Sequence, residues 1–239
     1  WSSDVCSSDL YLPLNAVLHR VPTGMSPEIA GIATPMSNGM RWTLLDGGVG
    51  VGSTVLIQGP GQQGMCCLMA AKQAGAATII ITGTSKDARR LEVARALGAD
   101  AAIDVQSQDP LDRIMTITNG RGVDVIVDCS SGAGSAPVVL GIEAAKRRGA
   151  TMVVQGEGNS TFPDFPMGRL TRKGMTLKSA RGHSYRAVEM GLQLLGSGRF
   201  PLDLLTTHRF GLSEVDYAIR SVGGQGAPGA IHVSVMPWK

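Results

Sequence analysis

Residues 54–64, TVLIQGPGQQG, decide the fold of this chain. The apolar and β-branched run from Thr54 to Gln58 predicts a buried strand, and Gly59-Pro60-Gly61 predicts a tight turn that closes it. A helical pattern over residues 63–75 follows at once. A strand, a glycine loop and a helix in this order are typical of the first unit of a parallel α/β sheet.

The G-x-G-x-x-G spacing of this loop points to a bound phosphate. Gly59 allows the turn, Gly61 lets a pyrophosphate approach the backbone, and Gly64 lets helix and strand pack closely. The helix start at Gln62 and Gln63 offers free N–H donors and the positive end of the helix dipole. A plain βα turn is the alternative interpretation. We expect a dinucleotide at this loop.

Strands and helices alternate along the rest of the chain. Further strands are predicted over residues 78–82, 101–104, 123–128, 151–155 and 175–179, and helices over residues 87–97, 111–118, 135–147 and 185–195. An earlier helix begins at Ser26-Pro27-Glu28, and we expect Pro35 to interrupt it. Apolar strands alternating with helices predict a doubly wound parallel sheet covered on both faces.

Two other loops at strand ends are candidate cofactor contacts. Residues 129–132, CSSG, follow one predicted strand, and Gln155 ends another. In an open α/β sheet the ligand lies across the carboxyl ends of the strands. Ser130 and Gly132 are therefore expected to flank a ribose, and Gln155 and Gly156 a nicotinamide. Ordinary polar loops are the alternative.

The end of the second strand bears on the type of cofactor. Dinucleotide folds usually place an acid there for the adenosine ribose, but this chain has Gly83-Thr84-Ser85. A missing acid removes repulsion against a 2′-phosphate, and hydroxyls with Arg89 and Arg90 offer it partners. This pattern favours NADP over NAD as the NAD(P) cofactor. Two solvated arginines on a helix are the alternative.

Composition excludes several classes of function. The net charge is +3, and the short basic clusters are not interleaved with aromatics, so no nucleic-acid partner is expected. No apolar run approaches the roughly 20 residues of a membrane span, so no membrane partner is expected. The four cysteines, Cys6, Cys66, Cys67 and Cys129, lack ligand spacing. They predict no metal site and are typical of free thiols in a cytoplasmic protein.

We assign no catalytic residue from the sequence. The four histidines, His19, His183, His208 and His232, lie in separate segments, and structural or surface roles are expected for them. Asp128, at the end of a strand, is expected to bond its own loop. Of Cys66 and Cys67 we expect one to be packed and the other partly exposed.

Five stretches resemble the medium-chain dehydrogenase/reductase superfamily, nearer its zinc-dependent alcohol and polyol dehydrogenases. They are GPGQQGMCCLMAAKQAGA (59–76), RLEVARALGADAAID (90–104), GRGVDVIVDCSSG (120–132), GATMVVQGEGN (149–159) and THRFGLSEVDYAI (207–219). They occur in the order of that family and extend over most of residues 11–239. The resemblance implies a Rossmann domain joined to a GroES-like β catalytic domain.

The resemblance also implies a division of the chain. Residues 26–200 would form the NAD(P)-binding Rossmann domain, residues 11–25 a remnant of the catalytic domain, and residues 201–239 a return to that domain. Residues 1–10, WSSDVCSSDL, look like translated adapter sequence and are expected to be a non-native leader on an N-terminally truncated chain. Zinc would then be possible only through the missing domain. Thr34 stands where polyol dehydrogenase-like members place a Glu ligand.

The function implied is an NAD(P)-dependent oxidoreductase of the alcohol or polyol dehydrogenase type. It would transfer a hydride between the cofactor and a small alcohol or carbonyl substrate, with this chain supplying mainly the cofactor-binding half. The chain alone would then be inactive. A non-catalytic dinucleotide-binding module is the alternative, and a methyltransferase is disfavoured by the missing acid. A homodimer through the edge of the Rossmann sheet is also expected.

Overall fold

Six parallel strands form the main sheet of the computed structural model, which describes residues 13–155, 161–162 and 164–238. The order across the sheet is β3-β2-β1-β4-β5-β6. The strands are β1 (Thr54–Gln58), β2 (Thr78–Gly83), β3 (Ala101–Asp104), β4 (Val125–Asp128), β5 (Thr151–Gln155) and β6 (Thr176–Ala180). The order reverses between β1 and β4, which makes this the topological switch point. The predicted doubly wound sheet is confirmed.

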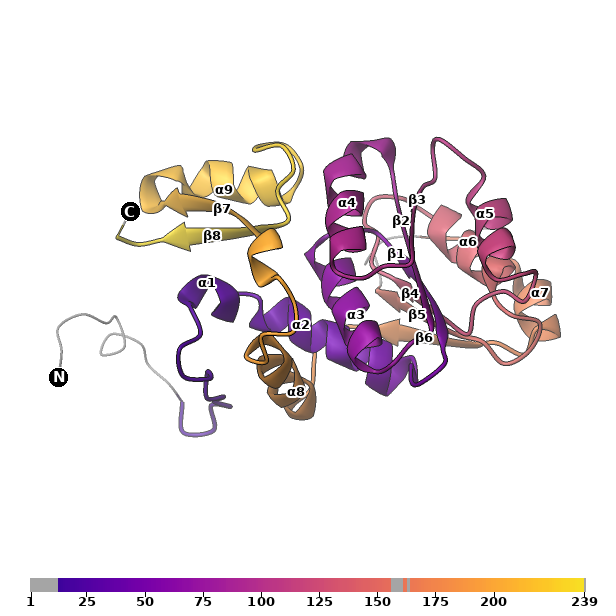
Figure 1. Cartoon of the computed structure of the whole chain (residues 1–239), viewed down its shortest axis with the longest axis horizontal. Coiled ribbons are helices and arrows are strands. Elements are labelled where there is room, and N and C mark those ends of the chain that lie inside the picture. Colours follow the sequence, from indigo (N-terminus) through magenta and orange to yellow (C-terminus); the bar gives the residue numbers. More distant parts are fainter. Residues whose placement is uncertain (1–12, 156–160, 163, 239) are drawn as a thin grey trace.

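Helices cover both faces of this sheet (Figure 1). One face packs against α2 (Ala33–Gly39), α3 (Gln62–Gln73), α4 (Ala88–Ala96) and α8 (Tyr185–Leu195). The other packs against α5 (Pro110–Ile117), α6 (Ala136–Ala144) and α7 (Met167–Arg172). Further helical segments include α1 (Pro27–Ala30), a π-helical stretch (Met40–Asp46) and 3₁₀ turns at Ser85–Asp87, Leu202–Leu204 and Leu212–Glu214.

Side chains alternate between the two faces of each strand, and this alternation divides the core into two layers. Val55 and Ile57 of β1 are buried on the face of α3, whereas Leu56 between them is buried on the opposite face. Side chains alternate across a strand, so a strand covered by helices on both faces must be apolar at every position. This is why the run at residues 54–57 contains no charged residue.

The first helical segment departs from its prediction. Its start is confirmed, since the Ser26 hydroxyl accepts a hydrogen bond from the Ile29 backbone N–H at 3.3 Å. The expected break at Pro35 is wrong, because α1 ends at Ala30 and Pro35 lies inside the first turn of α2. The first backbone N–H groups of a helix have no partner within it, so a proline is tolerated there.

A smaller unit follows the main sheet along the chain. Strands β7 (Thr206–Gly211) and β8 (His232–Met236) pair in parallel, and α9 (Val215–Val222) joins them. The Phe210 and Tyr217 rings meet edge to face, with their centroids 5.6 Å apart. Figure 1 shows this unit beyond α1 and α2, beside the chain's C-terminus. Among the residues that the structure describes, no helix is long and apolar enough to cross a bilayer.

Candidate NAD(P) site

The glycine loop makes a closed turn between β1 and α3. Gly59 has a φ of +91°, a left-handed conformation that glycine adopts without strain. Its N–H donates to the Thr82 carbonyl at 3.0 Å, which ties the loop to β2. Gly64 packs so tightly on Gly59 that an added Cβ would lie 1.9 Å from the Gly59 carbonyl oxygen.

Gly61 faces open space at the helix start. It is the N-cap of α3, and a Cβ added there would meet no atom within 4 Å. The first backbone N–H groups of α3 therefore border an open volume rather than protein atoms. An anion can approach the positive end of the helix dipole at this point.

A cleft of about 740 Å³ extends from this loop across the carboxyl ends of β1, β2, β4 and β5. Residues predicted as cofactor contacts that line it are Gly59, Gly61, Gln62, Gln63, Gly83, Thr84, Arg90, Ser130 and Gln155. Gly64, Ser85, Arg89 and Gly132 do not belong to its lining, and Gly156 lies outside the described residues. The cleft occupies the switch point, where open α/β sheets bind their ligands.

Two acids lie near the end of β2: Asp87, which follows it along the chain, and Asp104, which the sequence did not place there. The Ser85 hydroxyl donates to Asp104 Oδ2 at 2.7 Å, because Asp104 ends the neighbouring strand β3. Asp87 accepts hydrogen bonds from the Thr84 N–H at 3.0 Å and from the Thr84 hydroxyl at 2.8 Å. Bonds from Ser85 and the Gln106 backbone lower the pKa of Asp104, which keeps it ionised. Two carboxylates therefore adjoin the predicted adenosine ribose position.

The two arginines differ in their surroundings. Arg89 is exposed and pairs with Glu92 one helical turn away. Arg90 lines the cleft, and its Nη2 and Nε donate to the Ala230 carbonyl at 2.6 and 3.1 Å. Its Nη1 donates to Asp87 at 3.1 Å. Both guanidinium groups already have protein partners, so a 2′-phosphate would have to compete with those partners for the two arginines.

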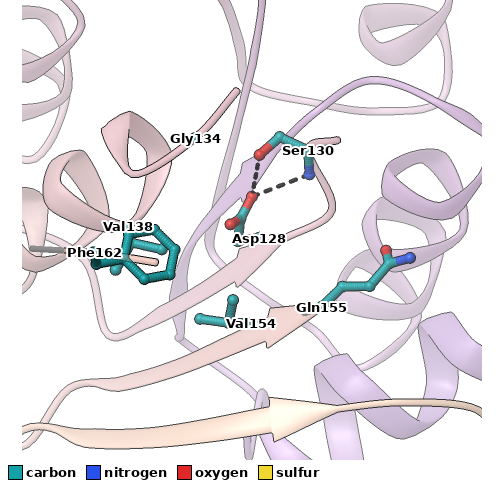
Figure 2. Close-up of a pocket in the computed structure, with 7 residues that line it drawn as sticks. All are labelled: Asp128, Ser130, Gly134, Val138, Val154, Gln155 and Phe162. Atoms are coloured by element: carbon teal, nitrogen blue, oxygen red, sulfur yellow. Dashed lines mark hydrogen bonds between the residues drawn. The ribbon is translucent and has the colours of Figure 1, made fainter. Parts of the chain in front are cut away.

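Asp128 and Ser130 form a small polar turn at the end of β4 (Figure 2). Asp128 Oδ1 accepts from the Ser130 hydroxyl at 2.5 Å and from its N–H at 3.0 Å. The expected loop-bonding role of Asp128 is thus confirmed. A cavity of about 20 Å³, room for about one water, lies between this turn and Val138, Val154 and Phe162.

Gln155 extends from the end of β5 beside that cavity and also lines the main cleft (Figure 2). Its Oε1 atom is buried and has no hydrogen-bond partner within the described part of the chain. Gln58, at the end of β1, has the same orphaned Oε1, while its Nε2 donates to the Pro137 carbonyl at 2.8 Å. Two buried acceptors at strand ends therefore lack a hydrogen-bond donor among the described residues.

The C-terminal unit contributes to the cleft in a way that the sequence did not reveal. Val222, Gly223, Gly224 and Ile231 line it, although they lie far along the chain from the glycine loop. His232 Nδ1 is 2.8 Å from Gln62 Oε1, the side chain at the first position of α3. Burial lowers the pKa of this imidazole. No local sequence signal connects residues so far apart.

The burial of Cys66 and Cys67 differs from the prediction. Cys66 and Cys67 are both fully buried, so the expectation that one is partly exposed is wrong. The helix α3 is apolar almost all round because α2 covers one side and the sheet the other. Cys129 is half-buried and lines the cleft, and its sulfur is 3.7 Å from that of Cys67.

Within residues 13–155, 161–162 and 164–238, no group of three or more His, Cys, Asp or Glu side chains could hold a metal ion. Thr34 is exposed in the first turn of α2. Three histidines have hydrogen-bond partners elsewhere, His19 with Glu189, His183 with Asn38 and His232 with Gln62. The Nδ1 atom of His208 is buried and has no hydrogen-bond partner within the described part of the chain. The residues that the structure describes therefore do not make a zinc centre.

The chain is similar in sequence to known dehydrogenases. The family described as zinc-binding dehydrogenase matches residues 64–196, which is more than half of the chain. A probable alcohol dehydrogenase of Mycobacterium tuberculosis is 32% identical over 217 residues, covering 90% of this chain and 59% of that protein. A sorbitol dehydrogenase of Halalkalibacterium halodurans is 29% identical, covering 86% and 58%. The chain spans less than two thirds of either relative.

Solved structures agree with this result. An alcohol dehydrogenase from Thermus sp. ATN1 superposes with a TM-score of 0.78 at 25% identity, covering 91% of this chain and 61% of that one. This chain belongs to the zinc-binding dehydrogenases of the medium-chain dehydrogenase/reductase superfamily and contains their NAD(P)-binding domain.

Proposed function

We propose that this chain binds NAD(P) across the cleft and supplies the cofactor half of an oxidoreductase of the alcohol or polyol dehydrogenase type. The pyrophosphate would lie on the loop of residues 59–64, the adenosine near Thr84 and the nicotinamide near Gln155. One observation carries this proposal: the open space over Gly61, at the start of α3, is continuous with the cleft along four strand ends.

The shape of the loop fits a pyrophosphate. Gly64 has no space for a side chain, which holds the turn closed, whereas Gly61 has space for one that the protein leaves empty. The orphaned Oε1 of Gln155 would accept a hydrogen bond from the carboxamide of a nicotinamide. Leaving a buried acceptor unpaired costs roughly 1–3 kcal/mol, so a ligand that supplies a donor gains that energy on binding.

The chain's own residues would bind and orient rather than react. Bound NAD(P) supplies the chemistry, accepting a hydride from an alcohol carbon or returning it to a carbonyl. The N–H groups at the start of α3 would hold the pyrophosphate, and Asp128 would fix Ser130 toward a ribose hydroxyl. Val222 and Ile231 would cover the cleft from the C-terminal unit and exclude water there.

The choice between NAD and NADP is decided at the end of β2. The missing acid after that strand favours NADP, while the Asp104 carboxylate beside Ser85 opposes a 2′-phosphate. A comparison of Kd for NADPH and NADH by quenching of the intrinsic fluorescence measures the balance. A clear preference for NADH would end the NADP prediction.

We further propose the division into residues 11–25, 26–200 and 201–239 that the family resemblance implies, and a cytoplasmic location. The separate two-stranded sheet of β7 and β8 supports the second boundary, and the free thiols support the location. A homodimer through the sheet edge is proposed at β6, whose Leu177 is 43% exposed.

The central experiment uses two matched glycine substitutions. Gly61→Ala places a methyl group where the pyrophosphate would lie, and we expect NAD(P)H to bind about tenfold more weakly or worse. Gly50→Ala is the control, because its added Cβ also meets no atom within 4 Å and Gly50 lies outside the cleft. Equal Kd values for both variants would refute the placement of the cofactor.

Turnover separates the enzyme from a binding module. Alcohol oxidation is assayed with and without added Zn²⁺, on this chain and on a longer one that includes the sequence encoded upstream. Cofactor binding by both chains without turnover by either supports the non-catalytic module. Binding of S-adenosylmethionine instead of NAD(P)H would replace the proposal with a methyltransferase.

A further inference from the structure

We propose that Cys67 and Cys129 form a reversible disulfide that makes NAD(P) binding sensitive to oxidants. The two sulfur atoms are 3.7 Å apart and belong to segments separated by 62 residues. Cys67 lies in the phosphate-binding helix α3, and Cys129 directly follows β4. The inference rests on the proposed binding of NAD(P) in the cleft.

The two sulfur atoms are in non-bonded contact with each other. A disulfide requires an S–S separation of about 2.05 Å, so the two sulfur atoms, now 3.7 Å apart, must approach each other by about 1.7 Å. Cys66, the neighbour of Cys67, is unsuited to this role. Its backbone and Cβ pack against Gly39 of α2, where an added Cβ would lie 2.7 Å from the Cys66 carbonyl.

An oxidant can reach only one member of the pair directly. Cys129 lines the cleft and is half-buried, whereas Cys67 is fully buried. The hydrogen bond with Cys67 and burial both raise the pKa of the Cys129 thiol, so we expect slow oxidation at neutral pH. A cofactor occupying the cleft would shield Cys129.

Hydrogen peroxide is the oxidant that we consider, because it is small enough to enter the cleft. Cys129 attacks one peroxide oxygen, the O–O bond breaks, and a sulfenic acid and one water form. Cys67 then attacks that sulfur, the S–O bond breaks, and the departing hydroxide takes the Cys67 thiol proton and leaves as the second water. Two thiols and one peroxide thus give one disulfide and two waters.

The cross-link would act on the phosphate loop through contacts already present. A Cβ built on Gly59 would lie 3.0 Å from the carbonyl carbon of Cys129, so the loop rests directly on this residue. The Cys129 N–H also donates to the Gln58 carbonyl at 2.8 Å. The loop is tightly packed, because Gly64 lies against the carbonyl oxygen of Gly59. Drawing α3 and Cys129 together is therefore expected to displace the loop.

The first measurement establishes the bond. The full chain carries Cys6→Ser, because residue 6 lies outside the described residues, and is treated with hydrogen peroxide and then with N-ethylmaleimide. Tryptic cleavage after Arg41 and Lys72 leaves Cys66 and Cys67 in one peptide, so mapping is repeated with Cys66→Ala. We expect residue 67 linked to residue 129 in both proteins, and dithiothreitol to reverse the link.

The second measurement tests the consequence. We expect the oxidised protein to bind NAD(P)H at least about fivefold more weakly than the reduced protein. Cys67→Ser should bind like the reduced protein and lose the response to peroxide, whereas Cys66→Ala should keep the response. NAD(P)H added before peroxide should slow formation of the link.

Each failure is distinct. Absence of the 67–129 link overturns this inference and leaves the proposed function intact, provided that the reduced protein binds NAD(P)H. If the link forms but the Kd for NAD(P)H does not change, the predicted sensitivity of NAD(P)H binding to oxidants is overturned. If the reduced protein binds no NAD(P)H, the proposed function and the predicted sensitivity fail together, while mapping still decides whether the disulfide forms.

Discussion

Gly64 lies directly against the carbonyl oxygen of Gly59, and a Cβ on Gly64 would come within 1.9 Å of that atom. The contact closes the turn between β1 and α3, so that the helix start points along the carboxyl ends of the strands. The same turn leaves Gly61 open toward the cleft. Two glycines of one motif therefore have opposite requirements: Gly64 has no space, and Gly61 has space that must stay empty.

Gly64→Ala is expected to destabilise the protein by about 1–3 kcal/mol, since the methyl group forces the rigid backbone apart. Urea unfolding measures the change as a shift in midpoint. Gly61→Ala is the matched control and should unfold at nearly the wild-type midpoint. Equal midpoints for Gly64→Ala and wild type would show that the loop can open without cost.

Asp104→Asn should shift cofactor preference toward NADP. The carboxylate, held beside Ser85 and ionised at neutral pH, repels a 2′-phosphate, whereas the amide keeps the shape and loses the charge. We expect the ratio of the NADPH to the NADH Kd to fall by about threefold to tenfold at low salt.

Asp216→Asn, on the exposed start of α9, is the control for that change and should leave the ratio as it is. An unchanged ratio in Asp104→Asn would mean that the adenosine ribose lies away from Ser85. A rise in the ratio would mean that the carboxylate assists the phosphate through a bound cation.

His232 should make folding stability depend on pH. Burial lowers its pKa below the ordinary 6.5, so the unfolded chain binds the proton more tightly than the folded one. The stability that the neutral imidazole contributes is present above pH 6.5 and is lost as the pH falls through the folded-state pKa.

Urea unfolding of wild type and His232→Gln at about pH 7.5 and about pH 5.5 measures this contribution. We expect the wild-type midpoint to fall more than that of the variant over this interval. Parallel losses in both proteins would assign the pH dependence to other groups.

Gln155→Met should weaken NAD(P)H binding without lowering the stability of the fold. Methionine has a similar length and removes the buried Oε1 that has no protein partner in the described structure, so stability should stay level or rise by roughly 1 kcal/mol. The increase in melting temperature on adding NAD(P)H should shrink, because the donor of the ligand loses its acceptor. A full-sized increase in the variant would place the nicotinamide elsewhere.

The sequence by itself determined the alternation of strands and helices, and with it the doubly wound parallel sheet, and the glycine loop. These features are local: a buried strand is apolar at each position, a left-handed turn such as that at Gly59 favours glycine, and each element follows the last within a few residues. Periodicity and turn chemistry act over such distances, so reading along the chain is sufficient. Burial of Cys66 and Cys67 together was missed because helix periodicity assumes one solvent-facing side.

Only the tertiary structure decided which distant side chains meet at the cleft. Asp104 reaches Ser85 because β3 pairs with β2, and His232 reaches Gln62 across 170 residues because β8 lies beside the start of α3. Cys67 meets Cys129 because α3 packs on the end of β4. Such contacts depend on the packing of whole elements, whose energies are summed over many residues and leave no mark in the local sequence.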